Sequence, residues 1–344
     1  MTAATEVALS FARTVERSLV HRAAVSEVFV TDLYQSGTAA FVAGAQLPLS
    51  HGYFGDHLRE PASYDFLLLL ESARQACTAA GHLYFEVPRD TVFLVNDWSI
   101  RIEDLDALTP GSRPGELRLE GTAERQEGRG GRLRGVRFDV SLRLGGRSVC
   151  RVEIGTSTSP AEDYQKLRFL QRRSAPPVTG DLGTVARGNA VGTAAVGRVN
   201  PLNVVLGEPV WADGAVSAQV EPRLENRSLF DHSYDHIPAM VLAEAARQLA
   251  HLAGVPTAAA VTACTARYLR FVELDSPVGA TARPHPAGAG TDAAAGAGAG
   301  TDAAAELLVE FRQDGAVVAE TSLTFASPSP AAALPGPAVT REAS

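Results

Sequence analysis

The sequence predicts an α+β protein in which one structural unit, an antiparallel sheet wrapped round a long helix, occurs twice. Residues 64–84 and 228–254 each contain an apolar run long enough for a buried helix. Both runs carry the motif E-x-A-R-Q, and its glutamates, Glu71 and Glu244, are 173 residues apart in a chain of 344. A motif repeated at about half the chain length indicates an internal duplication.

The second apolar run has the signals of a helix start and a helix end. Asp235 is expected to cap the N-terminus, Pro238 suits the first turn, and Gly254 ends the helix. Glu244 and Arg247 are three residues apart, so they share one face of this helix and can pair. Because the helix is apolar on nearly every side, both charges are expected to be buried.

The repeated motif places a carboxylate, a guanidinium and an amide on each helix. They are Glu71, Arg74 and Gln75 on the first helix, and Glu244, Arg247 and Gln248 on the second. One such helix alone is explained by a structural ion pair. Two apolar helices with the same charges need a further reason, because a buried charge without compensation costs several kcal/mol. A functional role is therefore predicted beside the structural one.

The elements around the two helices follow the same order in both halves. We predict a lead-in at 1–20, a first repeat at 21–160, a connector at 161–200, a second repeat at 201–327 and a mobile tail at 328–344. The first repeat has predicted strands at 24–31, 39–47, 92–103, 116–125, 132–144 and 147–157, with turns at Ser36-Gly37 and Gly145-Gly146. The second has predicted strands at 204–211, 216–220, 261–274, 278–283, 306–312 and 317–326, and a tandem Ala/Gly-rich loop at 286–305 that we expect to be disordered.

One long helix against an antiparallel sheet is the hot-dog architecture. Two hot-dog units pair by joining their sheets, and a duplicated chain does this within one molecule. The sequence therefore predicts a double hot-dog, with two antiparallel sheets that each wrap a long central helix. It would be a monomer with a pseudo-dimeric core, or a homo-oligomer of such chains.

Composition excludes several classes of protein. A net charge of −8 argues against general affinity for nucleic acid, and no run approaches the length of a membrane span. Charged residues interrupt the first 18 positions, so we expect no secretory signal and a cytoplasmic location. Cys77, Cys150 and Cys264 lack the spacing of a zinc site or a disulfide framework, so no metal is expected.

The start of the second helix resembles the signature H-F-x(n)-P-G-V-L-x-x-E-A of hot-dog dehydratases that act on acyl carrier proteins. The matching residues are Asp231-His232 and then Pro238 to Ala245. Ala239 replaces the usual Gly, and His232 lies closer to Glu244 than the His of that signature lies to its Glu. Those departures argue against simple dehydration.

Three longer segments are similar to the A-factor biosynthesis (AfsA-like) family of actinomycetes. They are V-H-R-A-A-V-S-E-V-F-V-T-D at 20–32, Tyr64-Asp65 leading to E-S-A-R-Q, and D-H-S-Y-D-H-I-P-A-M-V-L-A-E-A-A-R-Q at 231–248. The resemblance covers residues 20–325. It implies an acyltransferase that joins a β-ketoacyl group, delivered on the phosphopantetheine of an acyl carrier protein, to the hydroxyl of dihydroxyacetone phosphate. The product would lead to a γ-butyrolactone signal or a related butenolide or furan, without another cofactor.

This chemistry requires a base for the hydroxyl, donors for the developing oxyanion and a cation for the phosphate. Glu244 is the predicted base, with its pKa raised by the apolar helix, and the backbone N–H groups from Pro238 to Met240 are predicted to polarise the thioester carbonyl. Arg247 and Arg74 are predicted to bind the phosphate. Glu71 is expected to shape the opposite wall.

The remaining candidates have a structural explanation beside the functional one. His232 and His236 either assist proton transfer or merely cap and pack, and Asp235 is more simply a helix cap. His51 and Asp65 hold comparable places before the first helix. The candidate substrate-binding residues are completed by Asp235, Asp65, Gln75 and Gln248.

Two other functions stay open at this point. One is a hot-dog dehydratase or thioesterase that acts on carrier-bound acyl chains, and the other is a non-catalytic acyl-binding protein. Basic segments at 129–151 and 166–173 are ordinary solvated faces or a dock for an acidic carrier protein.

Overall fold

The computed structural model describes residues 7–182, 191–284 and 305–326. The first repeat contains β1 (Val30–Gly37), β2 (Ala40–Leu47), α1 (Phe66–Tyr84), β3 (Thr91–Ile102), β4 (Gly115–Glu127), β5 (Leu133–Leu144) and β6 (Arg147–Pro160). After α2 (Ala161–Arg172), the second repeat contains β7 (Val210–Ala212), β8 (Ala215–Gln219), α3 (Ala239–Leu252), β9 (Val261–Tyr268), β10 (Val278–Pro284), β11 (Ala305–Gln313) and β12 (Ala316–Phe325). The element order that the duplication predicts is confirmed.

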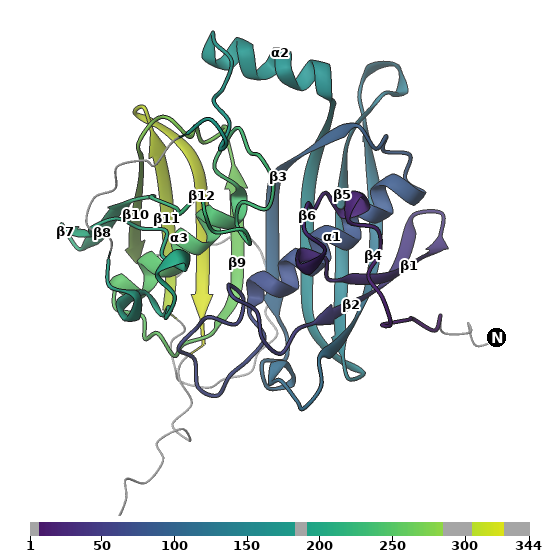
Figure 1. Ribbon diagram of the computed structural model, residues 1–344, viewed down its shortest axis with the longest axis horizontal. Coiled ribbons are helices and arrows are strands. Elements are labelled where there is room, and N and C mark those ends of the chain that lie inside the picture. Colours follow the sequence, from purple (N-terminus) through teal and green to yellow (C-terminus); the bar gives the residue numbers. More distant parts are fainter. Residues whose placement is uncertain (1–6, 183–190, 285–304, 327–344) are drawn as a thin grey trace, which may run out of the picture.

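The strands of both repeats form one antiparallel sheet, in the order β1-β2-β4-β5-β6-β3-β9-β12-β11-β10-β8-β7. β3 and β9 join the two halves, with Asp97 opposite Arg267 and Arg101 opposite Ala263. Each half has the same strand order when it is read outward from this joint, so the repeats are related by an approximate two-fold axis. Figure 1 shows α1 and α3 in their separate halves, with α2 lying across one end of the molecule.

The strands bury alternate residues against the helices, as the two-residue period of a sheet with one covered face requires. In β4, Leu117, Leu119 and Ala123 are buried while Glu116, Glu120 and their alternating neighbours are exposed or half-buried. Both helices are enclosed over most of their length. Glu71 and Glu244 are fully buried, which confirms the prediction that the motif charges lie inside.

The predicted strand at 24–31 is wrong for most of its length. Val25–Glu27 form a 3₁₀ turn, and β1 begins only at Val30 and turns after Gly37. The side chain of Gln75 bonds the Glu27 carbonyl oxygen and the Phe29 N–H, at 2.7 and 2.8 Å. This segment therefore satisfies its backbone through a helix side chain and not through a sheet partner.

The start of the second helix also differs from the prediction. α3 begins at Ala239, and Pro238 is its N-cap residue, so Asp235 does not cap it. The side chain of Asp235 is drawn away by Tyr164 and Arg168 of α2, a tertiary contact that local sequence does not reveal. The predicted strand at 204–211 is reduced to β7 and one bridge at Leu206, and β9 ends at Tyr268.

Several predictions concern residues outside those the structure describes. They are the first six residues of the lead-in, nearly all of the predicted loop at 286–305 and the tail at 328–344.

Candidate active site

Each E-x-A-R-Q motif builds the same buried network around its carboxylate. On α1, Glu71 accepts hydrogen bonds from Nε and Nη2 of Arg74 at 2.7 and 2.8 Å and from Gln75 at 2.7 Å. On α3, Glu244 accepts from Nη2 of Arg247 and, at 2.6 Å, from Gln248. The motif is therefore repeated in three dimensions as well as in sequence.

A second arginine completes each network and comes from the segment before the repeat's first strands. Arg22 donates to Glu71 from Nε and Nη2, at 3.1 and 2.5 Å. Arg198 donates to Glu244 from the same two nitrogens, at 2.8 and 2.7 Å. Neither arginine is among the site residues that the sequence predicts. The signal that could have found them is V-H-R at 20–22 against V-G-R at 196–198, but the predicted boundary left Arg198 in the connector.

The network of Arg198, Glu244 and Arg247, which we call the sealed network, is closed on every side. Nη1 of Arg247 donates to Asp65, and Nη1 of Arg198 donates to the carbonyl oxygens of Tyr53, at 2.8 Å, and Asp56. The adjoining cavity has a volume of only about 10 Å³, about enough for one water molecule. No substrate fits there.

The network of Arg22, Glu71 and Arg74, which we call the open network, lines a cavity of about 910 Å³. Within the described parts of the chain, Nη1 of Arg22 and Nη1 of Arg74 have no hydrogen-bond acceptor. The side chain of Arg74 is 22% exposed, against 8% for Arg247. Two guanidinium nitrogens are thus free to bind an anion in this cavity.

One pair of equivalent positions accounts for much of this difference. Asp65 is the N-cap residue of α1, and its carboxylate accepts from the N–H of Leu67 at 2.8 Å and from Arg247. The N-cap residue of α3 is Pro238, which has no carboxylate, and no side chain among the described residues caps this helix. Pro238 therefore leaves both the start of α3 and the side chain of Arg74 available to an anion.

The position of Glu244 corrects its predicted role. It belongs to the sealed network, and it is absent from the described residues that line the large cavity, whereas Glu71 is among them. Burial alone would raise the pKa of Glu244, but the charges of Arg198 and Arg247 lower it below its usual range. An ionised carboxylate bonded to two arginines is a poor general base, so the prediction of a raised pKa is wrong.

Glu71 is ionised for the same reason. Burial opposes its ionisation, but the charges of Arg22 and Arg74 hold the pKa of Glu71 at about 2. Both of its oxygens are occupied by donors. Through these bonds Glu71 holds two arginines that line the cavity.

The wall opposite Arg74 is the loop before α3, where His236 is held by Asp235. Nδ1 of His236 lies 2.7 Å from Oδ1 of Asp235. Asp235 is fixed in turn by the hydroxyl of Tyr164 at 2.8 Å and by Nε of Arg168 at 3.1 Å. Although burial alone would raise the pKa of Asp235, bonds from His236 and Tyr164 and the charge of Arg168 lower it. This leaves Nε2 of His236 as the nitrogen available for proton transfer.

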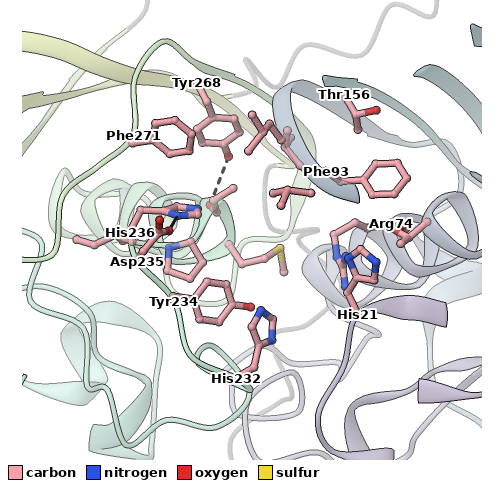
Figure 2. A pocket seen from close by; sticks show the side chains of 18 of the residues that line it. His21, Arg74, Phe93, Thr156, His232, Tyr234, Asp235, His236, Tyr268 and Phe271 are labelled. Carbon is pink, nitrogen blue, oxygen red and sulfur yellow. Dashed lines mark hydrogen bonds and ion pairs between the residues drawn. The ribbon is translucent and has the colours of Figure 1, made fainter. Parts of the chain in front are cut away.

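His232 lies between the two walls. Its ring stacks on Tyr234 with the centroids 4.1 Å apart, and Figure 2 shows both below the gap that separates His236 from Arg74. The neighbouring Asp231 bonds the N–H groups of Ala23 and Ala24, at 2.5 and 3.0 Å. The loop of the second repeat is thus tied to the segment that carries Arg22, and the cavity is assembled from both repeats.

The other predicted residues have structural places. Arg247 is occupied by Asp65 and Glu244, and Gln75 and Gln248 connect their helices to the preceding segments. Cys77 is a buried free thiol at the edge of the cavity, and burial raises its pKa far above the usual range. That thiol is not a nucleophile at neutral pH.

The described segments contain neither a membrane-spanning helix nor a cluster of metal ligands. No helix in these segments is long and apolar enough to cross a membrane. No three His, Cys, Asp or Glu side chains in them converge to hold a metal ion.

The fold defines a double hot-dog protein, and the large cavity lies between its two halves. A putative oleoyl thioesterase from Lactobacillus plantarum has a similar fold, with a TM-score of 0.50 at 8% identity over 85% of this chain and 98% of its own. The profile of the A-factor biosynthesis hotdog domain matches residues 3–160 and 186–327, and the chain belongs to this family. The duplicated fold and the family resemblance that the sequence predicts are confirmed.

Two similar proteins from Streptomyces are named as synthases. The chain is 34% identical to the 2-oxo-3-(phosphooxy)propyl 3-oxoalkanoate synthase of Streptomyces virginiae, over 80% of this chain and 88% of the relative. It is 30% identical to the synthase of the same name from Streptomyces coelicolor (strain ATCC BAA-471 / A3(2) / M145), over 79% and 83%. The chain is therefore an enzyme of the synthase type.

Proposed function

We propose that this chain catalyses the transfer of a 3-oxoacyl group from the thioester of an acyl carrier protein to a hydroxyl of dihydroxyacetone phosphate. The observation that carries the proposal is the pair of free guanidinium nitrogens, on Arg22 and Arg74, in a cavity that also contains an uncapped helix start. The names of the relatives specify a phosphooxy group and a 3-oxoalkanoate ester. The cavity offers a place for each.

The phosphate binds to Nη1 of Arg74 and Nη1 of Arg22. Guanidinium groups bind phosphate through parallel, charge-assisted hydrogen bonds, and these two are held in place by Glu71. The sealed network supports this assignment, because there the carboxylate of Asp65 occupies Nη1 of Arg247. Asp65 therefore occupies the position that the substrate anion takes in the open network.

The thioester carbonyl lies at the start of α3. Ala239 and Met240 line the cavity, and no side chain among the described residues caps this helix start. In this proposal their N–H groups stabilise the negative charge that develops on the carbonyl oxygen. In the sealed network the carboxylate of Asp65 bonds both the start of α1, through the Leu67 N–H, and the side chain of Arg247. The oxyanion and the phosphate of one tetrahedral intermediate therefore lie close to one another.

His236 donates a proton to the leaving group at this end of the cavity. Asp235 fixes its ring through Nδ1, as the third group does in other acyl-transfer sites, and Nε2 protonates the departing thiolate. The apolar part of the cavity, which includes Phe93, Phe138 and Ile154, takes the acyl chain. Both walls come from one chain, so the proposed reaction can take place within a single subunit.

The test is to incubate the protein with a 3-oxoacyl carrier protein and dihydroxyacetone phosphate and to record the masses of all products. Acyl transfer gives free carrier and a phosphorylated ester. A thioesterase would give free carrier and a free acid, and a binding protein would leave every mass unchanged. A dehydratase would be detected in a parallel reaction with the 3-hydroxyacyl carrier protein, whose mass would fall by that of one water molecule. Dihydroxyacetone without phosphate is the matched control, and its ester should form far more slowly.

A further inference from the structure

The backbone of His21 has a positive φ angle, which is uncommon for residues other than glycine. It follows a 3₁₀ turn in the left-handed conformation, with φ 54° and ψ 46°. The equivalent residue of the second repeat, 176 positions later, is Gly197 in the same turn, with φ 71° and ψ 26°. Glycine adopts this conformation without cost and histidine does not. The first repeat therefore places an imidazole where the fold favours glycine, and His21 lines the large cavity.

The ring of His21 is held by His82 of α1. The Nε2 atoms of the two rings are 2.8 Å apart, and Nδ1 of His82 lies 2.9 Å from the carbonyl oxygen of Val87. Because a carbonyl oxygen only accepts, His82 carries its proton on Nδ1, and its Nε2 is the acceptor when the ring is neutral. His21 must then donate from Nε2. Its own Nδ1 is left with a free lone pair.

The surroundings keep the imidazole of His21 neutral. Burial is the main cause, and the neighbouring His82, Arg74 and His232 add to it, so that the pKa of His21 falls to about 4. The ring packs edge-on against Phe93, with the centroids 5.8 Å apart. Figure 2 shows His21 beside Arg74 on the wall that faces His236.

We infer that His21 is a catalytic residue that accepts the proton of the acceptor hydroxyl through Nδ1, with His82 as the residue that fixes its tautomer. This inference rests on the proposed function. When the phosphate of dihydroxyacetone phosphate binds to Arg74 and Arg22, the free hydroxyl at the other end of the same molecule lies next to His21. As the hydroxyl oxygen attacks the thioester carbon, the C–O bond forms and the proton passes to Nδ1. The C–S bond then breaks, and the thiolate leaves with a proton from His236.

A negative group bound at Arg74 strengthens this base. The phosphate offsets the positive charge that lowers the pKa of His21, so the imidazolium formed in the transition state is stabilised only when the correct acceptor is bound. An acceptor without phosphate lacks this effect. The position of His21 thus links recognition of the phosphate to activation of the hydroxyl.

The experiment uses two variants of the full chain, His21→Gly and His21→Asn, in the carrier-protein assay. Both residues tolerate the left-handed backbone, so both variants should unfold at or above the wild-type temperature. Each should lose about 10²- to 10⁴-fold in kcat, with KM for dihydroxyacetone phosphate little changed. Added imidazole should restore turnover to His21→Gly, which leaves room for it, and not to His21→Asn.

The outcomes separate the two proposals. If the wild type makes the ester and both variants keep its kcat, the role of His21 is refuted while the proposed function stands. A loss that appears only as a higher KM and does not respond to imidazole would make His21 a binding residue and would also overturn the inference. If the wild type makes no ester, the proposed function fails and this inference fails with it.

Discussion

The open and sealed networks have the same plan, and they differ in what lies in front of them. Each has a buried glutamate, two arginines and a glutamine that anchors the preceding segment. In the sealed network the outer guanidinium nitrogens are bonded to Asp65 and to two backbone carbonyls, whereas in the open network they face a cavity. The repeated motif is thus a structural frame in both halves, and under the proposed function only the open network is left to bind substrate.

The sites are also assembled across the repeats. The large cavity takes its arginines from the first repeat and its helix start, His232 and His236 from the second. Asking which repeat is catalytic therefore has no single answer. One of the two equivalent positions is filled by the carboxylate of Asp65, while the other opens onto the large cavity.

The largest expected effect is on stability, in the sealed network. Arg247→Met leaves the buried carboxylate of Asp65 with the Leu67 N–H and, among the charged side chains of the described residues, a long contact to Arg59 at 3.4 Å, so we expect a loss of about 3–5 kcal/mol. The matched variant Arg74→Met should cost about 1 kcal/mol, because Arg74 is partly exposed and Glu71 keeps Arg22. Urea unfolding of the two variants measures the difference. Equal losses would show that the two networks are equally closed.

In catalysis the order of the two variants should reverse, so that Arg74→Met has the larger effect and Arg247→Met the smaller one. Arg74→Met removes a charged hydrogen bond to the substrate phosphate, so kcat/KM for dihydroxyacetone phosphate should fall about 10- to 100-fold. Arg247→Met, assayed where it is still folded, should keep its affinity for the acceptor. A fall confined to Arg247→Met would restore the role that the sequence suggested for that residue.

The glutamates extend the comparison. Glu71→Gln should raise KM for the phosphorylated acceptor by about tenfold, because the two arginines lose the carboxylate that orients them. Glu244→Gln should lower stability and leave the folded enzyme's kcat unchanged. Since the pKa of Glu71 is about 2, its charge is constant from about pH 5 to 8, so the pH profile of kcat/KM there should be the same in Glu71→Gln as in the wild type. An inflection that disappears in Glu71→Gln would show that Glu71 titrates and acts as a base.

The smallest expected effect is at the basic segment 166–173, which the sequence suggests as a dock for an acidic carrier protein. Arg173 follows α2 and is exposed, whereas Arg172 pairs with Glu273 and Asp275. Arg173→Glu should therefore raise KM for the acyl carrier protein a fewfold at low salt, an effect that added salt removes. Arg172→Glu should act mainly on stability. A KM that is unchanged by Arg173→Glu at low ionic strength would place the dock elsewhere.

The sequence predicted the fold well because the fold depends on local patterns. The period of apolar residues located both helices and nearly all strands, and the E-x-A-R-Q repeat revealed the duplication. Errors arose where a distant side chain decides the local structure, as when Gln75 holds the backbone of Glu27 and Phe29, or when α2 draws Asp235 away from the helix start.

The site was predicted only in part. Sequence indicated Arg74, His232 and His236, which do line the cavity, but it placed the chemistry on Glu244 and Arg247, which do not face it. The reason is that Asp65 and Pro238 precede their helices at equivalent positions, and the sequence does not show which distant side chain each of them contacts. In the structure, the carboxylate of Asp65 bonds Arg247 and fills the sealed network, whereas Pro238 has no carboxylate to offer Arg74. Arg22 and Arg198 were missed because each lies more than 40 residues from the glutamate that it pairs with.

Calorimetric titration with dihydroxyacetone phosphate tests the central claim most directly. The account predicts that wild type binds one molecule per chain, that Arg74→Met weakens binding by at least about tenfold, and that Arg247→Met leaves the Kd of its folded fraction unchanged. Two molecules per chain, or binding that survives in Arg74→Met and is lost in Arg247→Met, would contradict the assignment of the open network as the substrate site.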